Sequence, residues 1–168
     1  QQRPKILVAR KTFAEGLDPL QAVCDIDYNE SDTIYPKAVL TEKLAGVQGA
    51  LVTGSERIDA TALALAKDLK IVSNMMVGYN NFDLPAMSAA GVMGTNTPDV
   101  LTDTTADLAF GLILSTARRM AESEHWLRAG HWQNWALDQW LGQDVHHATL
   151  GIVGMGRIGQ AIAKRASG

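Results

Sequence analysis

The residues best suited to a defined chemical task stand near the end of the sequence. Residues 154–159 read Gly-Met-Gly-Arg-Ile-Gly, after the apolar run 150–153 and before helix-favouring residues. In a G-x-G-x-x-G turn the first glycine permits a sharp bend, the second lets the backbone approach a pyrophosphate, and the third allows close helix packing. The anion then rests on the unpaired amides of the helix N-terminus. The pattern predicts a dinucleotide-binding turn formed by Gly154, Gly156, Arg157, Ile158 and Gly159.

Composition and charge narrow the functional classes. The chain has 168 residues, 46% of them hydrophobic, with a net charge of -3. Such values are ordinary for a globular protein and predict neither nucleic-acid nor anionic-membrane binding. No apolar run approaches the roughly 20 residues that span a bilayer. The single cysteine, Cys24, and a start that resembles no signal peptide favour a cytoplasmic location.

Residues 1–100 alternate short β-rich runs with helical stretches, which predicts an α/β protein with a doubly wound parallel sheet. The expected strands are 5–9, 25–28, 49–53, 69–73 and 92–96, and the expected helices are 13–23, 37–44, 60–68 and 84–91. Asp59 and Asp83 are the expected N-caps of the last two helices.

The pattern changes after residue 100. Thr102 or Asp103 can cap one long helix that runs to about Arg128, apolar in its first half and polar in its second, as a connector between domains would be. The next segment carries Trp132, Trp135 and Trp140, too many tryptophans for a solvated loop, so it covers a core or forms an interface. A strand is expected at 149–153, with both of its edges unpaired.

Four stretches in order resemble the D-isomer-specific 2-hydroxyacid dehydrogenase family. They are 77–83, 96–109, 129–132 and 149–159. A lone glycine motif is weak evidence, whereas four ordered motifs are specific. The resemblance runs from about Lys5 to the last residue and is greatest to glyoxylate/hydroxypyruvate reductases and 2-ketogluconate reductases.

The resemblance implies two domains with the active site between them. Residues 1–100 would form a flavodoxin-like substrate domain and residues 101–130 a long interdomain helix. Residues 131–148 would form a tryptophan-rich dimerisation arm, with a homodimer made through Trp132–Trp140. Residues 149–168 would begin a Rossmann domain with its first strand and helix.

The implied reaction is hydride transfer from NADPH or NADH to a small 2-oxo acid: glyoxylate, hydroxypyruvate or 2-ketogluconate. The product is the D-2-hydroxy acid. Backbone amides of Val77 and Gly78 would hold the substrate carboxylate, and Thr53 and Gly54 would line the pocket. Thr105 would reach the cofactor. For each of these residues an ordinary turn or helix cap is the competing interpretation.

The resemblance supplies no catalytic residue within this sequence. The family's catalytic arginine, glutamate and histidine map beyond Gly168, and none of the four histidines here matches. None has the i, i+4 spacing of a metal-binding pair, so no metal is expected. The acidic residue that reads the cofactor ribose also lies further on, which leaves NAD against NADP preference open. We therefore expect these 168 residues alone to be inactive.

Two departures from the family pattern bear on the alternatives. Asn80 stands where the family usually has aspartate. Met75 and Met76 offer no positive charge for a doubly charged substrate, which ranks phosphite and phosphoglycerate below simple 2-oxo acids. A non-enzymatic NAD(H)-sensing or interaction protein of the same fold stays an alternative.

Overall fold

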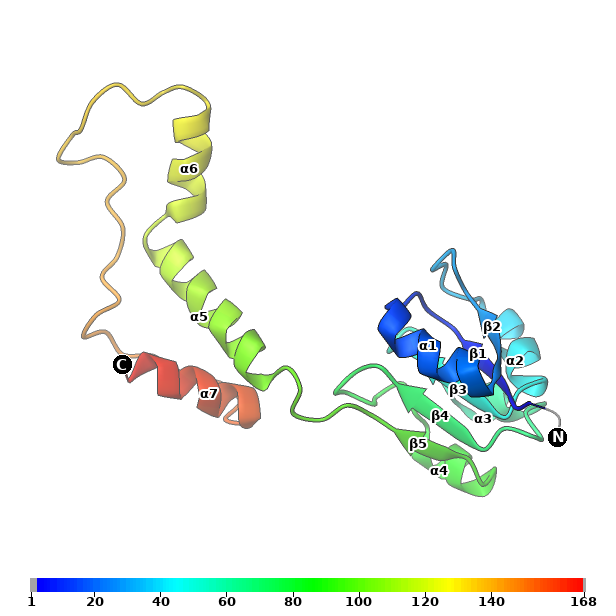
Figure 1. Ribbon diagram of the computed structural model, residues 1–168. Coiled ribbons are helices and arrows are strands. Elements are labelled where there is room, and N and C mark those ends of the chain that lie inside the picture. The colour runs from blue at the N-terminus through cyan, green and yellow to red at the C-terminus, as the bar shows by residue number, and fades with distance from the viewer. Residues whose placement is uncertain (1–2, 168) are drawn as a thin grey trace. The chain divides into compact units, whose positions relative to one another are not determined.

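The structure, a computed structural model, describes residues 3–167 and divides into two compact units, Gln1–Val100 and Leu101–Gly168. The first unit holds a parallel sheet in the order β2-β1-β3-β4-β5 (Figure 1). Its strands are β1 Lys5–Val8, β2 Asp25–Tyr28, β3 Gly49–Val52, β4 Ile71–Asn74 and β5 Met93–Thr95. Its helices are α1 Ala14–Val23, α2 Lys37–Ala45, α3 Ala60–Leu63 and α4 Leu84–Ala89. The predicted doubly wound α/β sheet is confirmed, in the flavodoxin-like strand order.

The core of the first unit lies on one face of this sheet. Right-handed crossovers place α1 on one face and α2, α3 and α4 on the other, because the chain reverses direction after β2. Strand residues Leu7, Val52 and Val72 are fully buried, and they share a cluster with Leu44 of α2 and Met87 of α4. Burial of each such side chain stabilises the fold by about 1.5–3 kcal/mol.

The opposite face is less covered. Cα pairing aligns Leu51, Ser73 and Thr95 across three strands, and Ile71 lies beside Met93. The helix on this side, α1, packs beside β2, at the far end of the sheet. Met93 is 63% exposed. The β3–β5 part of this face therefore has no helix of the first unit over it.

Local helix signals are confirmed at both aspartate caps. The Asp59 carboxylate accepts from the Thr61 and Ala62 amides, each at 3.0 Å, and the Asp83 carboxylate accepts from the Ala86 amide at 3.1 Å. The helix predicted over 60–68 is too long, since α3 ends at Leu63. Tight turns follow instead. The Ala66 amide donates to the carbonyl of Leu63, and the Leu69 amide donates to the carbonyl of Ala66.

The prediction of a single long helix in the second unit is wrong. The structure has α5 Thr102–Ala117 and α6 Met120–Arg128, separated by Arg119 in a left-handed conformation, φ 54°. At the break, the carbonyl of Ala117 accepts from the Gln143 amide at 2.8 Å rather than from a helical amide. A residue 26 positions later in the sequence thus takes the place of a helical donor at the break.

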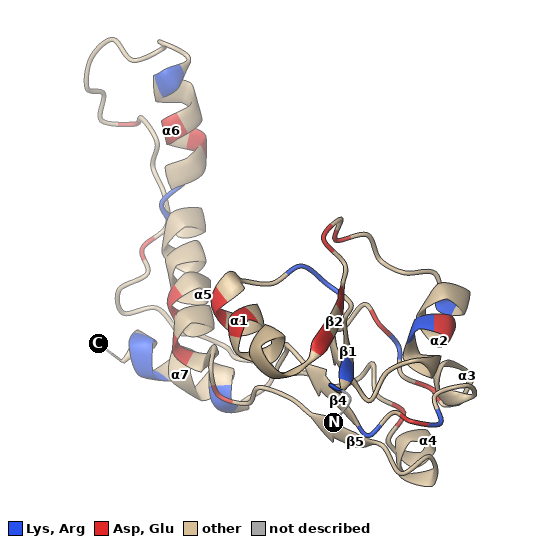
Figure 2. Ribbon diagram, turned by 45° about the vertical axis from the view of Figure 1, so that its right-hand side comes forward, with Lys and Arg blue, Asp and Glu red and all other residues tan. Residues whose placement is uncertain are grey.

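The strand predicted at 149–153 does not form. Among the described residues every strand belongs to the first unit, so this segment has no neighbour with which to pair its backbone. Val153 is fully exposed. The helix after the glycine turn does form, as α7 Arg157–Ala166, and it packs on α5. Figure 2 shows its basic C-terminal end, whose Arg165 pairs with Asp107 and Asp103 of α5.

Candidate functional site

The substrate-site residues predicted from the sequence gather at the carboxyl edge of the sheet. Strands β3 and β4 are parallel neighbours, so the loops that follow them begin side by side. Thr53 and Gly54 lie in the first loop, and Val77 and Gly78 lie in the second. The Met75 amide donates to the carbonyl of Val52 at 2.8 Å and joins the two loops at their base. Open α/β sheets bind ligands at this edge.

Three consecutive carbonyls in the second loop are anchored from behind. The carbonyl of Met76 accepts from the Thr97 amide at 3.0 Å, and that of Val77 accepts from Asn96 Nδ2 at 2.8 Å. The carbonyl of Gly78 accepts from Asn74 Nδ2 at 2.7 Å. The donors come from the end of β4 and from the segment after β5. The loop is therefore held by groups outside itself.

This anchoring orients the amides. In a planar trans peptide the carbonyl and the following N–H point in opposite directions. Fixing the carbonyls of Met76 and Val77 therefore turns the amides of Val77 and Gly78 away from their anchors. Within residues 3–167 neither amide has a hydrogen-bond acceptor. Two adjacent unpaired donors are suited to a small anion.

A buried asparagine pair ties the second loop to the first. Asn81 Nδ2 donates to the carbonyls of Thr53 and Glu56, both at 3.0 Å. Its Oδ1 accepts from Asn74 Nδ2 at 3.1 Å. Asn74 and Asn81 are 2% and 9% exposed, and amides buried this deeply require such partners. The pair makes the two loops one unit.

The hydrogen-bond donors of Thr53 bond within its own loop. Its amide and its hydroxyl both donate to Glu56 Oε2, at 2.9 and 3.0 Å, and Glu56 is buried. The amide of Gly54 donates to Met76 Sδ at 2.9 Å. Of the four predicted substrate-site residues, only Val77 and Gly78 present amides that lack an internal acceptor.

An arginine stiffens the outer side of the first loop. Arg10 donates to the Ser55 hydroxyl and to both carboxylate oxygens of Asp32, at 2.8 and 3.1 Å. The hydrogen bond from Arg10, together with the Lys11 amide, lowers the pKa of Asp32 to about 2. Asp32 therefore stays ionised at neutral pH, and its negative charge balances the positive charge of Arg10.

The glycine turn has the backbone that its sequence predicts. Gly154 has φ 100°, a conformation that side-chain-bearing residues rarely adopt. A Cβ on Gly159 would lie 2.2 Å from the carbonyl oxygen of Gly154, so only glycine fits there. A Cβ on Gly156 would meet nothing within 4 Å, which leaves the approach to the start of α7 open. These three positions suit a pyrophosphate on the helix N-terminus.

Among the described residues, no hydrogen bond joins Thr105 to the glycine turn. Thr105 is half-buried in the first part of α5. Its neighbours Asp103 and Asp107 both contact Arg165, near the other end of α7. Residues 103 and 107 share a helix face that Thr105, about 200° away around the helix, does not share.

The histidines do not gather into a site. His125 lies in α6, His131 stacks near Trp126 with ring centroids 6.0 Å apart, and His146 packs against His147. All four belong to the second unit. In the described part of the chain no three His, Cys, Asp or Glu side chains are placed to hold a metal ion, and no helix could cross a membrane.

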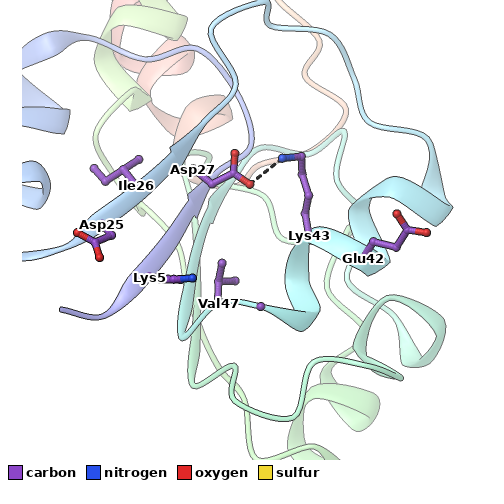
Figure 3. A pocket seen from close by; sticks show the side chains of 8 residues that line it. Lys5, Asp25, Ile26, Asp27, Glu42, Lys43 and Val47 are labelled. Atoms are coloured by element: carbon purple, nitrogen blue, oxygen red, sulfur yellow. Dashed lines mark hydrogen bonds and ion pairs between the residues drawn. The ribbon is translucent and has the colours of Figure 1, made fainter. Parts of the chain in front are cut away.

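A cavity larger than any at the predicted site residues lies elsewhere, at the amino edge of the sheet. It measures about 410 Å³ and includes none of the predicted site residues (Figure 3). Two of its charges are paired, since Lys43 Nζ bonds to Asp27 at 2.6 Å and this contact raises the pKa of Lys43. A smaller cavity of about 210 Å³ adjoins the second loop and is lined by Tyr79, Phe82, Leu84, Gly94, Thr95 and Asn96.

Comparison with known families agrees with this arrangement. The model of the D-isomer specific 2-hydroxyacid dehydrogenase catalytic domain matches residues 6–164. The chain belongs to this family. The resemblance predicted from the four sequence motifs is thereby confirmed.

Individual relatives are reductases of 2-oxo acids. Glyoxylate reductase of Thermococcus onnurineus is 44% identical over 170 residues, covering 99% of this chain and 51% of that protein. Glyoxylate/hydroxypyruvate reductase B of Yersinia pestis is 49% identical over 127 residues, covering 74% of this chain and 39% of that protein. The chain therefore spans about half the length of the curated relatives it matches.

Solved structures show the same fold. The TT0316 protein of Thermus thermophilus has a TM-score of 0.88 and 40% identity, covering 97% of this chain and 52% of that one. The NADPH-dependent glyoxylate/hydroxypyruvate reductase of Sinorhizobium meliloti, in complex with NADP and malonate, has a TM-score of 0.79 and 34% identity, covering 99% and 50%. The nucleotide in that structure supports the prediction of an NADPH or NADH cofactor.

Two glycine substitutions should separate cofactor contact from helix packing. Gly159→Ala forces a Cβ onto the Gly154 carbonyl and should lower the free energy of unfolding by about 1–3 kcal/mol. Gly156→Ala meets no neighbour and should cost less than about 1 kcal/mol, yet its methyl group should weaken NADPH or NADH binding at least about tenfold. Calorimetry on the intact protein measures both. Unchanged cofactor affinity in Gly156→Ala would show that no phosphate approaches there.

Proposed function

We propose that the intact protein that contains this chain reduces a small 2-oxo acid to the D-2-hydroxy acid with NADPH or NADH. The proposed substrate is glyoxylate, hydroxypyruvate or 2-ketogluconate. The observation that carries the proposal is the pair of outward-turned amides at Val77 and Gly78, at the carboxyl edge of the sheet. Relatives of the chain are glyoxylate reductases.

In this proposal the chain's own residues bind and orient. The amides of Val77 and Gly78 hold the substrate carboxylate, and hydrogen bonds to a charged acceptor are roughly twice as strong as neutral ones. A Cβ on Gly78 would meet nothing within 4 Å in the protein itself. A glycine at this position thus matters to a ligand and not to the fold.

The glycine turn and the start of α7 hold the cofactor pyrophosphate. The bound cofactor supplies the hydride, while the protein positions it against the keto carbon. The family's catalytic arginine, glutamate and histidine do not match any position of this sequence. We therefore propose that these 168 residues alone show no turnover.

Steady-state kinetics of the intact protein test the substrate proposal. We expect NADPH or NADH oxidation with glyoxylate, hydroxypyruvate or 2-ketogluconate. Gly78→Ala should raise KM at least about tenfold, equivalent to about 1.4 kcal/mol, because the methyl group occupies the position of the carboxylate. Its melting temperature should match that of the parent, since the added Cβ lies in open space.

The matched control is Gly46→Ala, at a glycine whose Cβ would also meet nothing within 4 Å. It lies at the end of α2 and should leave KM unchanged. An unchanged KM in Gly78→Ala would refute the carboxylate site. Turnover of phosphite or phosphoglycerate, or cofactor binding with no turnover of any substrate, would favour the phosphite/phosphoglycerate dehydrogenase or NAD(H)-sensing alternatives.

We also propose a homodimer made through the arm at residues 131–148, and a cytoplasmic location. Part of the arm packs on α6: Trp126 meets Trp132 edge-on at 6.5 Å and Trp140 at 5.5 Å between ring centroids. Arg119 lies 4.8 Å from the Trp140 ring. Trp135 is 72% exposed, which leaves it available as an anchor for a partner.

Sedimentation of the intact protein tests the arm. Replacing Trp132 and Trp135 together with alanine should convert dimer to monomer, since interface tryptophans each contribute about 2 kcal/mol or more. Phe13→Ala removes an aromatic side chain that is 82% exposed in the first unit and should leave the dimer intact. A double variant that still sediments as a dimer would contradict the proposal.

A further inference from the structure

Met76 bridges the two loops of the candidate substrate site. Its Sδ atom accepts from the Gly54 amide at 2.9 Å, so a side chain from the loop after β4 caps the loop after β3. The residue is 43% exposed, which places it at the surface of the site and not in the core. A methionine in this position contacts whatever enters between the loops.

The contact also masks a hydrogen-bond donor. The amide of Thr53 is already held by Glu56, whereas the thioether is the acceptor of the Gly54 amide among the described residues. A thioether sulfur is a weak acceptor, and substrate oxygens are stronger ones. The Gly54 amide therefore becomes available to a ligand only when the Met76 side chain moves away.

The thioether fills the space above Gly54 as well. A Cβ built on Gly54 would lie 2.9 Å from Met76 Sδ and 3.4 Å from its methyl carbon. The backbone that carries this side chain is fixed, because the Met76 carbonyl is held by Thr97. The space above Gly54, in the loop next to the one that carries the Val77 and Gly78 amides, is thus filled by one side chain.

We propose that Met76 is the specificity-determining residue of this site and restricts it to 2-oxo acids of two or three carbons. The inference rests on the proposed function and narrows its substrates from three to glyoxylate and hydroxypyruvate. The four further carbons of 2-ketogluconate, compared with glyoxylate, require the space that the thioether occupies. A filled pocket of this kind changes the ratio of kcat/KM between two substrates by about 10–200-fold.

Kinetics of the intact protein with glyoxylate and 2-ketogluconate test this inference. In Met76→Ala the ratio of kcat/KM for 2-ketogluconate to that for glyoxylate should rise at least about tenfold. Met76→Ser, a second small variant, should show the same rise and guards against a folding defect in the first. Met76→Leu keeps the volume without the sulfur and should retain the parental ratio.

Met75→Ala is the control, because Met75 is the adjacent, half-buried methionine whose amide joins the base of the loops. It should leave the ratio unchanged. A parental ratio in folded Met76→Ala and Met76→Ser would overturn the inference alone, with the reductase proposal intact. Unfolding of both small variants would make Met76 a structural residue and also overturn it. Absence of 2-oxo acid reduction by the parent would overturn both proposals.

Discussion

The anchoring of the Met76, Val77 and Gly78 carbonyls is the interaction on which the candidate site depends. Each peptide is planar, so a carbonyl held from behind fixes the direction of the N–H beside it. Three donors, the Thr97 amide and the side chains of Asn96 and Asn74, do this together. The two amides that result point away from these donors, and neither has an acceptor among residues 3–167. An anion site made in this way needs no charged side chain.

The same physical solution appears in both units of the chain. In the first unit, backbone amides are exposed by anchored peptides at the edge of a sheet. In the second, α7 begins directly after a glycine that leaves the approach to its first turn open. One site suits a small carboxylate and the other a pyrophosphate. Both proposed anion sites thus use backbone amides, in a chain whose net charge is -3.

Much of this architecture could be predicted from sequence because it depends on local signals. Alternating strands and helices predicted the parallel sheet, and the aspartates at 59 and 83 cap helices as expected. The break at Arg119 could not be predicted, because the Gln143 amide that contacts it is remote in sequence. The strand at 149–153 failed for a related reason: a strand requires a neighbour, and a pattern read along the chain does not show whether one is present.

The loop residues of the candidate site were named from the sequence, but the side chains that hold the loop in place were not. Val77 and Gly78 came from the family motif, but the side chains that orient them did not. Asn74 carried a signal, since an amide at the end of a strand must find partners once it is buried. Thr53, by contrast, was predicted to line the pocket, whereas both of its donors serve Glu56. Whether a polar group faces a ligand or its own loop depends on tertiary contacts.

The most direct test of the outward-turned amides is a titration of this chain with malonate, followed by 1H–15N correlation spectra. The anchored-peptide arrangement predicts weak, saturable shifts that are largest at the amides of Val77 and Gly78. Asn96→Ala should reduce these shifts, because it frees the Val77 carbonyl and lets the Gly78 amide turn. Saturable shifts confined to the amino-edge cavity around Lys5 and Lys43, with none at Val77 or Gly78, would contradict the account.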